Sequence, residues 1–308
     1  MPRQIRVFAP GSIGNVGPGL DILGLAVSGA GDTVEAELLD EPGIVLADPG
    51  HPDLPQAPER HASAIAALAV LRRAGTAGKL GLRLRVTKGL PLSGGQGGSA
   101  ASAVAGAVAA NWLLDTPLSA EEVLLAALES ESRLAGRHVD NLAPSLLGGM
   151  VLIRSLEPLD VIRIPVPTTL RIVLAHPAQA LDTRDGRAVL PDRVPRSVAL
   201  HQAAQVGAVI AAAYAGDFAL LGRAIDDRIA EPARAPLLPG FLRAKAAARD
   251  AGALGCSISG SGPTAFAFAS DDAGAVRIAA AMCSAYGATG IPCTARVERP
   301  DTEGARVL

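Results

Sequence analysis

The 308-residue sequence predicts an α+β fold and is long enough for about two domains. Strand and helix patterns alternate along the whole chain, no repeat of fixed period occurs, and the predicted strands cluster together. This clustering argues against a doubly wound parallel sheet, in which single strands alternate with helices. The segment 155–160 is the best candidate boundary, so we expect an N-terminal domain over 1–157 and a C-terminal domain over 158–308.

Strands are indicated by alternation with a period of two, and turns by clusters of glycine and proline. In the first half we expect strands over 5–9, 33–39, 44–46, 80–86 and 150–153, and helices over 59–73, 99–114 and 119–134. The first strand should end in a glycine-rich loop over 10–19, and the next two should pair around Pro42 and Gly43. Ser119 and Glu122 fit a capping box, which sets the start of the third helix.

The second half repeats the mixture of strands and helices. We expect strands over 171–175, 255–259 and 264–269, helices over 198–214, 218–229 and 241–250, and a last helix ending at 285. Two uncharged stretches, 89–114 and 197–216, are rich in alanine and glycine. A membrane span would contain more large aliphatic residues, so we expect both stretches to form buried helices.

Composition excludes several classes of protein. Hydrophobic residues make up 49% of the chain and charged residues 19%, which excludes a disordered protein. The 28 lysines and arginines nearly balance 30 acidic residues, so no electrostatic attraction to nucleic acid or to an anionic membrane is expected. An aromatic content of 3% also argues against a surface on which bases stack.

The three cysteines, Cys256, Cys283 and Cys293, are odd in number and have no C-x-x-C spacing. They predict neither a disulfide framework nor a thiolate metal site, and they fit a reducing compartment. The N-terminal residues lack the apolar core of a signal peptide. We therefore expect a cytoplasmic protein.

The strongest local signal lies between 91 and 102, where a predicted strand ends, glycines crowd the connection and a helix of small residues follows. Glycine allows close approach of a bulky group, and a helix start offers unpaired N–H donors and a partial positive charge. An anion such as phosphate is the natural occupant. The two best-known phosphate motifs are absent, so phosphate binding and a plain turn before a packed helix both stay open on these residues alone.

A second group of polar residues follows the helix predicted over 119–134. Glu131 lies late on this helix, and His138, Asp140 and Asn141 lie in the loop beyond it. Carboxylate oxygens suit Mg²⁺, which commonly takes only one or two protein carboxylates. A solvated helix end with a polar turn is the alternative, and zinc is poorly supported because no third ligand has suitable spacing.

Two loops carry arginines, Arg187 within 183–191 and Arg234 within 231–234. Guanidinium groups bind carboxylates or phosphates through two parallel hydrogen bonds, although most loop arginines are solvated. The segment 257–264 reads as a tight strand–turn–strand unit, suited either to packing or to supporting a neighbouring phosphate loop.

Taken together, these segments resemble the GHMP kinase superfamily and, within it, the homoserine kinase family. Residues 91–101 approximate the superfamily pattern P-x-x-x-G-L-G-S-S-A-A, and 258–264 match its third motif. Residues 9–24 and 129–149 resemble segments typical of the homoserine branch. The matches run in order from residue 5 to about 270, so the resemblance covers nearly the whole chain.

The resemblance implies a two-domain fold, with an N-terminal ribosomal-protein-S5-like domain and a C-terminal ferredoxin-like α/β-plait domain. It implies phosphorylation of L-homoserine to O-phospho-L-homoserine on the route to threonine, with ATP and Mg²⁺ as cosubstrate and metal. The pocket for the adenine would draw on 55–66 or nearby segments. We also expect a homodimer.

Site residues follow by position. The resemblance assigns ATP binding to Pro91, Leu92, Ser93, Gly94, Gly95, Gln96, Gly97, Gly98, Ser99, Ala100 and Ala101. It assigns Mg²⁺ to Ser99 and Glu131, and homoserine to Asn15, Asp21, His138, Asp140, Arg187 and Arg234. Asp140 suits the ammonium group of homoserine, and the two arginines suit its carboxylate.

Asn141 and Arg187 are the expected catalytic residues. Related kinases of the superfamily use an aspartate base, and in the homoserine branch an asparagine, matched here by Asn141, takes its place. The hypothesis is that no side-chain base exists and that the hydroxyl proton passes to the γ-phosphate during transfer. Asn141 would then position the acceptor or the phosphate by hydrogen bonding.

Residues 91–101, called the phosphate loop below, depart from the superfamily pattern at two positions. Gln96 stands where an apolar residue is usual, and Gly98 lacks a hydroxyl that often lies beside the phosphates. Backbone donors survive both changes, so binding should persist. Two alternatives stay open: a kinase for another small alcohol, such as a mevalonate-pathway intermediate or a sugar, and a nucleotide-binding relative that has lost catalysis.

Overall fold

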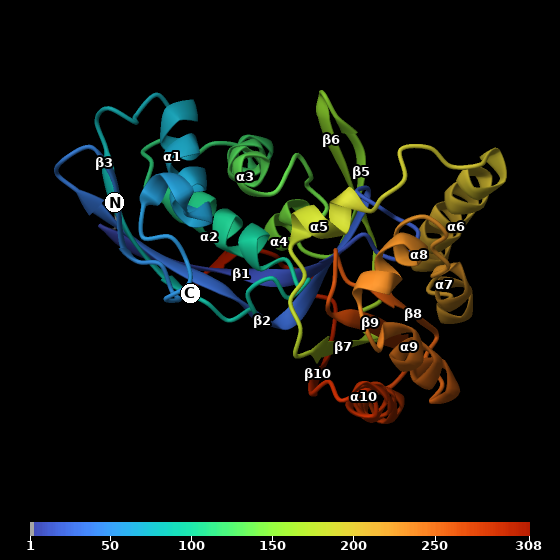
Figure 1. Cartoon of the computed structure of the whole chain (residues 1–308). Helices are drawn as coiled ribbons and strands as arrows, with labels where there is room; N and C mark the ends of the chain where they lie inside the picture. The colour runs from blue at the N-terminus through green and yellow to red at the C-terminus, as the bar shows by residue number, and fades with distance from the viewer. Residues whose placement is uncertain (1–2) are drawn as a thin grey trace.

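The computed structural model describes residues 3–308, and the first two residues of the expected N-terminal domain lie outside the described residues. The chain forms two sheets, a mixed sheet of seven strands and an antiparallel sheet of four (Figure 1). Helices α1 to α4 cover the larger sheet, and the smaller sheet lies beside it with α10 at its outer side (Figure 1). The predicted α+β class is therefore what the strands and helices form.

The larger sheet has the strand order β11-β1-β2-β4-β3, and β5 pairs with β2 and β6. Its strands are β1 (Gln4–Gly14), β2 (Leu23–Leu39), β3 (Gly43–Asp48), β4 (Gly81–Thr87), β5 (Met150–Leu156), β6 (Leu159–Ile164) and β11 (Arg306–Val307). Strand β3 runs parallel to β4, and the other pairs are antiparallel. Strands β2 and β3 thus do not pair with each other, which corrects the pairing expected around Pro42 and Gly43.

The first strand continues to Gly14, so the loop expected from residue 10 begins later than predicted. A Cβ atom on Gly11 would lie 2.9 Å from a methyl carbon of Leu90, and one on Gly14 only 2.4 Å from Oδ2 of Asp140. These glycines therefore lie in a strand, not a turn, and they allow other chain segments to approach it closely.

Helices α1 (Ala62–Arg73), α2 (Gly98–Trp112), α3 (Ala120–Leu134) and α4 (Leu142–Leu147), preceded by the 3₁₀ turn η1 (Pro58–Arg60), belong to the first half. The predicted capping box is confirmed, since the Glu122 N–H donates to Ser119 Oγ and the Ser119 N–H to Glu122 Oε2. Helix α2 is buried over most of its length, as expected for the stretch 89–114. Its small residues are needed where α1 crosses it, because a Cβ on Gly106 would lie 2.4 Å from the Ser63 carbonyl oxygen.

The smaller sheet is antiparallel, in the order β10-β7-β9-β8. Its elements, with the helices around it, are β7 (Arg171–Pro177), α5 (Thr183–Ala188), α6 (Arg196–Ala215), α7 (Phe218–Ala224), α8 (Ala230–Arg234), η2 (Ala235–Leu237), α9 (Phe241–Asp250), β8 (Gly255–Ile258), β9 (Ala265–Ala269), α10 (Asp272–Gly287) and β10 (Cys293–Glu298). Alternate residues of its strands serve two cores. Val173 packs with residues of α9 and α10, whereas Ile172 packs with α6, α7 and Ile13 of the larger sheet. The core that contains Ile172 and Ile13 therefore joins the two sheets.

Helix α6 is mostly exposed, so the expectation of a buried helix over 197–216 is wrong. Only 22% of its most apolar 18-residue stretch is buried, at residues such as Gln202 and Val209. Within the described residues, α6 is the one helix whose length and composition alone would suffice to cross a membrane.

The expected division of the chain at 157 falls within the β5–β6 hairpin. Both of these strands belong to the larger sheet, which therefore extends to Ile164. The C-terminal β11 also returns to this sheet beside β1. Division into two domains at 157 stays a prediction.

The close contact of α1 with α2 predicts that Gly106→Ala destabilises the protein. Alanine favours a helix by up to about 1 kcal/mol, but overpacking against the Ser63 carbonyl should cost about 1–3 kcal/mol. Gly207→Ala in α6 is the matched control, since nothing lies within 4 Å of a Cβ there. Thermal unfolding should show a lower midpoint for Gly106→Ala and an equal or higher midpoint for Gly207→Ala. An unchanged or raised midpoint for Gly106→Ala would contradict the packing described.

Candidate active site

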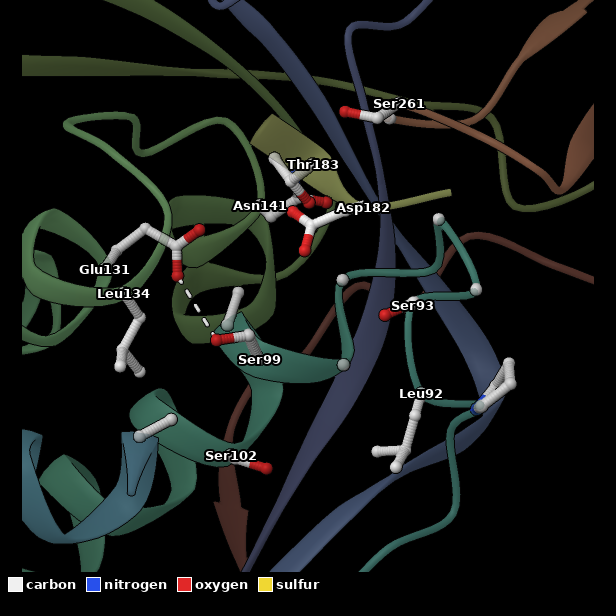
Figure 2. A pocket seen from close by; sticks show the side chains of 18 of the residues that line it. Leu92, Ser93, Ser99, Ser102, Glu131, Leu134, Asn141, Asp182, Thr183 and Ser261 are labelled. Carbon is white, nitrogen blue, oxygen red and sulfur yellow. Dashed lines mark hydrogen bonds between the residues drawn. The ribbon is translucent and has the colours of Figure 1, made fainter. Parts of the chain in front are cut away.

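A cavity of about 730 Å³ lies where both halves of the chain meet. Its wall is formed by Asn15 and by residues from the segments 53–62, 88–102, 131–141, 180–187 and 260–262. Figure 2 shows the start of α2 beside the glycine-rich loop, with Glu131 pointing toward Ser99. The cavity thus brings together the phosphate loop, the polar loop after α3 and one of the arginine-bearing segments.

Most residues expected at the site line this cavity. They are Asn15, Pro91, Leu92, Ser93, Gly94, Gly95, Gly97, Gly98, Ser99, Ala100, Glu131, His138, Asp140, Asn141 and Arg187. Asp21, Gln96, Ala101 and Arg234 do not belong to its lining. Residues 53–55 and 60–62 also line it, on the segment expected to contribute to an adenine pocket.

Three consecutive carbonyl groups of the phosphate loop are held from outside the loop. Thr264 Oγ1 donates to the Gly94 oxygen at 2.6 Å, and Ser259 Oγ donates to the Gly95 oxygen at 2.6 Å. The Ser12 N–H donates to the Gln96 oxygen at 3.1 Å. In a trans peptide the N–H points opposite to the C=O, so the next three amides point away from these partners.

Glycine is required at two places in this loop. Gly95 and Gly97 both have a φ of +70°, in the left-handed region that other residues rarely adopt. A Cβ on Gly95 would lie 2.6 Å from the oxygens of Ser259 and Gly262. The loop therefore packs directly on the turn that follows β8, and α2 begins at its end with free N–H groups. These amides and the helix start suit an anion.

Glu131 and Ser99 face each other across the cavity, with Ser99 Oγ 3.5 Å from Glu131 Oε2. Burial, followed by the charge of Asp140, raises the pKa of Glu131 to about 7. Both side chains offer oxygen atoms, the ligands that Mg²⁺ prefers. Among residues 3–308, no group of three His, Cys, Asp or Glu side chains is placed to hold a metal.

Asp140 is buried and is oriented by the backbone. The Asn15 N–H donates to Asp140 Oδ2 at 3.0 Å, and this amide is presented by a left-handed Asn15 with a φ of 56°. Asn15 Oδ1 in turn accepts from the Asp21 N–H at 2.7 Å. Burial, together with the charge of Asp21, raises the pKa of Asp140 to about 7. A cation in the cavity would favour its ionised form.

Asn141 lies between the phosphate loop and Asp140. Ser12 Oγ donates to Asn141 Oδ1 at 2.9 Å, so the amide oxygen faces Ser12. A Cβ on Gly97 would lie 3.0 Å from this same oxygen, so Asn141 contacts the middle of the loop. Its Nδ2 hydrogens are thereby left to act as donors.

The two predicted arginines occupy different positions. Arg187 pairs with Asp21 through both terminal nitrogens, and its buried Nε has no hydrogen-bond partner among the described residues. Arg234 is only 1% exposed and donates to the carbonyl oxygens of Gly186 and Gly260, both at 2.9 Å. Arg234 therefore fixes the residue next to Arg187, while Arg187 reaches the cavity.

His138 faces Glu131, with its Nδ1 3.9 Å from Glu131 Oε1. Burial, followed by the charge of Arg187, lowers the pKa of His138 to about 4. The imidazole is therefore neutral near pH 7 and can donate or accept a hydrogen bond.

Sequence reasoning missed a buried ion pair beneath the start of α2. Lys88 is paired with Asp32, and Lys88 Nζ also donates to the Gly98 oxygen and to Ser102 Oγ, both at 3.0 Å. Ser102 donates to Asp32 at 2.6 Å. Lys88 lines the cavity, and its place at the end of a predicted strand just before the glycine-rich loop was the available signal. Asp182 and Thr183, also in the lining, were missed because Arg187 alone was singled out there.

Family models of the GHMP kinases match both halves of the chain. The model of the GHMP kinases N terminal domain matches residues 61–149, and that of the GHMP kinases C terminal matches 209–288. These ranges contain the phosphate loop and Asn141 in the first case, and α8 and the turn after β8 in the second. Fold and site together therefore define a kinase of the GHMP type.

Relatives over the full length narrow the assignment. The homoserine kinase of Chlorobium phaeobacteroides is 43% identical, over 99% of this chain and 100% of that protein. That of Arabidopsis thaliana is 40% identical, over 99% of this chain and 85% of that protein. The crystal structure of homoserine kinase from Cytophaga hutchinsonii matches with a TM-score of 0.95 at 40% identity, over 100% of this chain and 98% of that one. The chain belongs to the homoserine kinase family, and the expected two-domain GHMP kinase fold is confirmed.

The raised pKa of Asp140 predicts that Asp140→Asn stabilises the protein at high pH. The folded-state pKa of about 7 lies above the ordinary value of 3.8, so the stability of the natural chain should fall as pH rises between these values. Each unit of pKa difference corresponds to about 1.4 kcal/mol, so the variant should unfold at least about 2 °C higher at pH 8. This gain should shrink as pH falls from 7 toward 4.

Asp192→Asn is the control, because Asp192 is exposed on a surface loop. Thermal unfolding in the absence of ligands, at pH 5 and pH 8, measures both variants. A midpoint for Asp140→Asn that tracks the natural chain at both pH values would show that the buried carboxyl bears no such penalty.

Proposed function

We propose that this enzyme transfers the γ-phosphoryl group of ATP to the side-chain hydroxyl of L-homoserine, giving ADP and O-phospho-L-homoserine. The observation that carries the proposal is the juxtaposition, in one cavity, of the phosphate loop with a carboxyl group, Asp140, and a guanidinium group, Arg187. Relatives named homoserine kinase, at 40–43% identity over nearly the whole chain, support it. The product would serve threonine biosynthesis.

At the nucleotide end of the cavity, backbone N–H groups would hold the triphosphate. The amides following Gly94, Gly95 and Gln96 and the start of α2 are preorganised donors, so they need no rearrangement to bind a triphosphate. Lys88 is paired with Asp32 and donates to the Gly98 oxygen at 3.0 Å, so this ion pair supports the first turn of α2 from below. The segment 53–62 forms the adjoining wall, where the nucleoside would lie.

A magnesium ion fits the residues present. Ser99 and Glu131 supply two oxygen ligands, and phosphate oxygens and water would complete the coordination sphere, as is common for this metal. When bound, Mg²⁺ would neutralise charge on the β- and γ-phosphates. A cation near Glu131 would also lower the raised pKa of this acid and keep it ionised.

Homoserine would bind through its two charges. The ammonium group would face Asp140, whose carboxylate it would stabilise in the ionised form. The carboxylate would approach Arg187, whose buried Nε–H has no partner among residues 3–308 and costs about 1–3 kcal/mol while it lacks one. Binding would therefore relieve two unfavourable features of the free site.

Transfer itself would proceed without a side-chain base. Asn141 occupies the position beside the phosphate loop, and an amide cannot accept the hydroxyl proton as a base would. The proton would pass to an oxygen of the transferred phosphoryl group as the new P–O bond forms and the bond to ADP breaks. The Nδ2 hydrogens of Asn141 would orient the acceptor hydroxyl or the γ-phosphate.

The direct test is release of ADP from purified protein with Mg-ATP and one candidate acceptor at a time. L-Homoserine should support turnover, whereas L-threonine, mevalonate and galactose should give rates near the background. Faster turnover with mevalonate or galactose would replace homoserine by another small alcohol. Nucleotide binding in calorimetry without turnover on any acceptor would instead indicate a protein that has lost catalysis.

Removal of the Asn141 amide should lower kcat. Asn141→Ala is expected to reduce kcat by about 10²–10³-fold, the loss typical of deleting one preorganised donor. The affinity for ATP should change much less, because the loop amides remain. Ser145→Ala is a nearby control, since Ser145 Oγ is spent on the Pro10 oxygen and does not line the cavity. A kcat for Asn141→Ala within about threefold of the natural value would make Asn141 a spectator.

A further inference from the structure

Gln96 is the one residue between Gly94 and Gly98 that does not line the 730 Å³ cavity. Its side chain is only 4% exposed and turns to the opposite side of the loop. There it lines a second, smaller cavity of about 210 Å³, together with His176 of β7 and Arg296 of β10. The side chain thus points away from the larger cavity and contacts the smaller sheet.

Both polar atoms of the Gln96 amide are hydrogen-bonded there. Arg296 donates to Gln96 Oε1 at 2.6 Å, and Gln96 Nε2 donates to Thr264 Oγ1 at 3.0 Å. An arginine can only donate, so the amide oxygen must face Arg296 and the amide nitrogen must face Thr264. The orientation of Gln96 is therefore set by chemistry as well as by space.

The Thr264 hydroxyl links this network to the loop backbone. Its single hydrogen is donated to the Gly94 oxygen at 2.6 Å, so it can only accept from Gln96 and from His176 Nδ1, which lies 3.0 Å away. Burial and the charge of Arg296 lower the pKa of His176, so the imidazole is neutral and donates from Nδ1. Every hydrogen-bonding position of the hydroxyl is then occupied.

Arg296 is itself fixed in the smaller sheet. It lies opposite Leu174 in the β10–β7 pair, and its other terminal nitrogen lies 3.3 Å from Glu298 Oε1. The bond to Gln96 therefore ties the centre of the phosphate loop, 200 residues earlier in the sequence, to a regular strand. Glycines on both sides of Gln96 have positive φ values, so the loop has little stiffness of its own.

We propose that Gln96 is a positioning residue, which holds the phosphate loop in its nucleotide-binding shape by joining it to Arg296 and Thr264. This inference rests on the proposed binding of ATP at that loop. An apolar side chain of the same size would fill the space but would leave the Arg296 donor and the Thr264 acceptor without this partner. The loop would then occupy its binding-competent shape for a smaller fraction of the time, and the apparent affinity would fall by that fraction.

The test is a double-variant cycle with Gln96→Leu, Arg296→Leu and both together, measured by calorimetry with a nonhydrolysable ATP analogue and Mg²⁺. Each single variant should bind the nucleotide at least about fivefold more weakly than the natural chain. The affinity of the double variant should be no lower than that of the weaker-binding single variant. The KM for L-homoserine at saturating ATP should stay within about twofold, because Asp140 and Arg187 are untouched. Arg277→Leu, at an exposed position of α10, is the matched control and should bind as the natural chain does.

The outcomes separate this inference from the function it rests on. Binding by Gln96→Leu and Arg296→Leu equal to that of the natural chain, or losses that simply add in the double variant, would overturn the positioning role. If the natural chain itself fails to bind the nucleotide, the proposed function falls and the inference falls with it. Thermal midpoints check folding, and should Gln96→Leu fail to fold, Arg296→Leu, which alters no residue of the loop, decides in its place by the same fivefold criterion.

Discussion

The phosphate loop depends on three hydrogen bonds that turn consecutive carbonyl groups away from the cavity. Their donors are the Ser12 amide in the larger sheet and the Ser259 and Thr264 hydroxyls at the ends of two strands of the smaller sheet. Gly95 and Gly97 hold the loop's two left-handed positions beside Gln96, and glycine cannot impose this shape by its own rotational preferences. Both sheets must therefore meet before the amides point together, which explains why a loop in the first half depends on a turn from the second.

Charge in the free site is arranged at a cost to stability. Burial raises the pKa of both Glu131 and Asp140, with the charge of Asp140 adding to the first shift and that of Asp21 to the second. Among residues 3–308, the buried Nε–H of Arg187 has no hydrogen-bond partner. Such features persist where ligands later supply the missing partners. A divalent cation beside Glu131, an ammonium beside Asp140 and a carboxylate beside Arg187 would each compensate one of them. The same groups would therefore give the site selectivity for a zwitterionic acceptor.

Sequence reasoning succeeded where the signal was local. The capping box at Ser119, helix α9 and the glycine-rich connection before α2 all lie where their own residues indicate. It failed where distant contacts decide. Gly11 and Gly14 have the composition of a loop, but they lie in a strand that packs closely on other segments. Strands β6, β10 and β11 have weak sequence patterns, because pairing with neighbouring strands determines them. Helix α6 has a buried helix's composition yet lies largely exposed.

The site was predicted unevenly for the same reason. Ser99, Glu131, Asp140 and Asn141 were singled out because motif and chemistry agreed; they share one cavity, and their roles in the reaction stay predictions. Lys88 was missed because its partner Asp32 is 56 residues away, and Arg234 proved to hold the backbone near Gly186 rather than line the cavity. A location in the cytoplasm and assembly as a homodimer stay predictions, since neither depends on contacts within one chain.

The most direct measurement of the central claim is a crystal structure with a nonhydrolysable ATP analogue, Mg²⁺ and L-homoserine. We expect phosphate oxygens within hydrogen-bond distance of the amide nitrogens of Gly95, Gln96 and Gly97, with the three carbonyl oxygens still bound to Thr264, Ser259 and Ser12. A triphosphate bound elsewhere, or a loop whose peptide planes have turned to point these carbonyls into the cavity, would contradict the account.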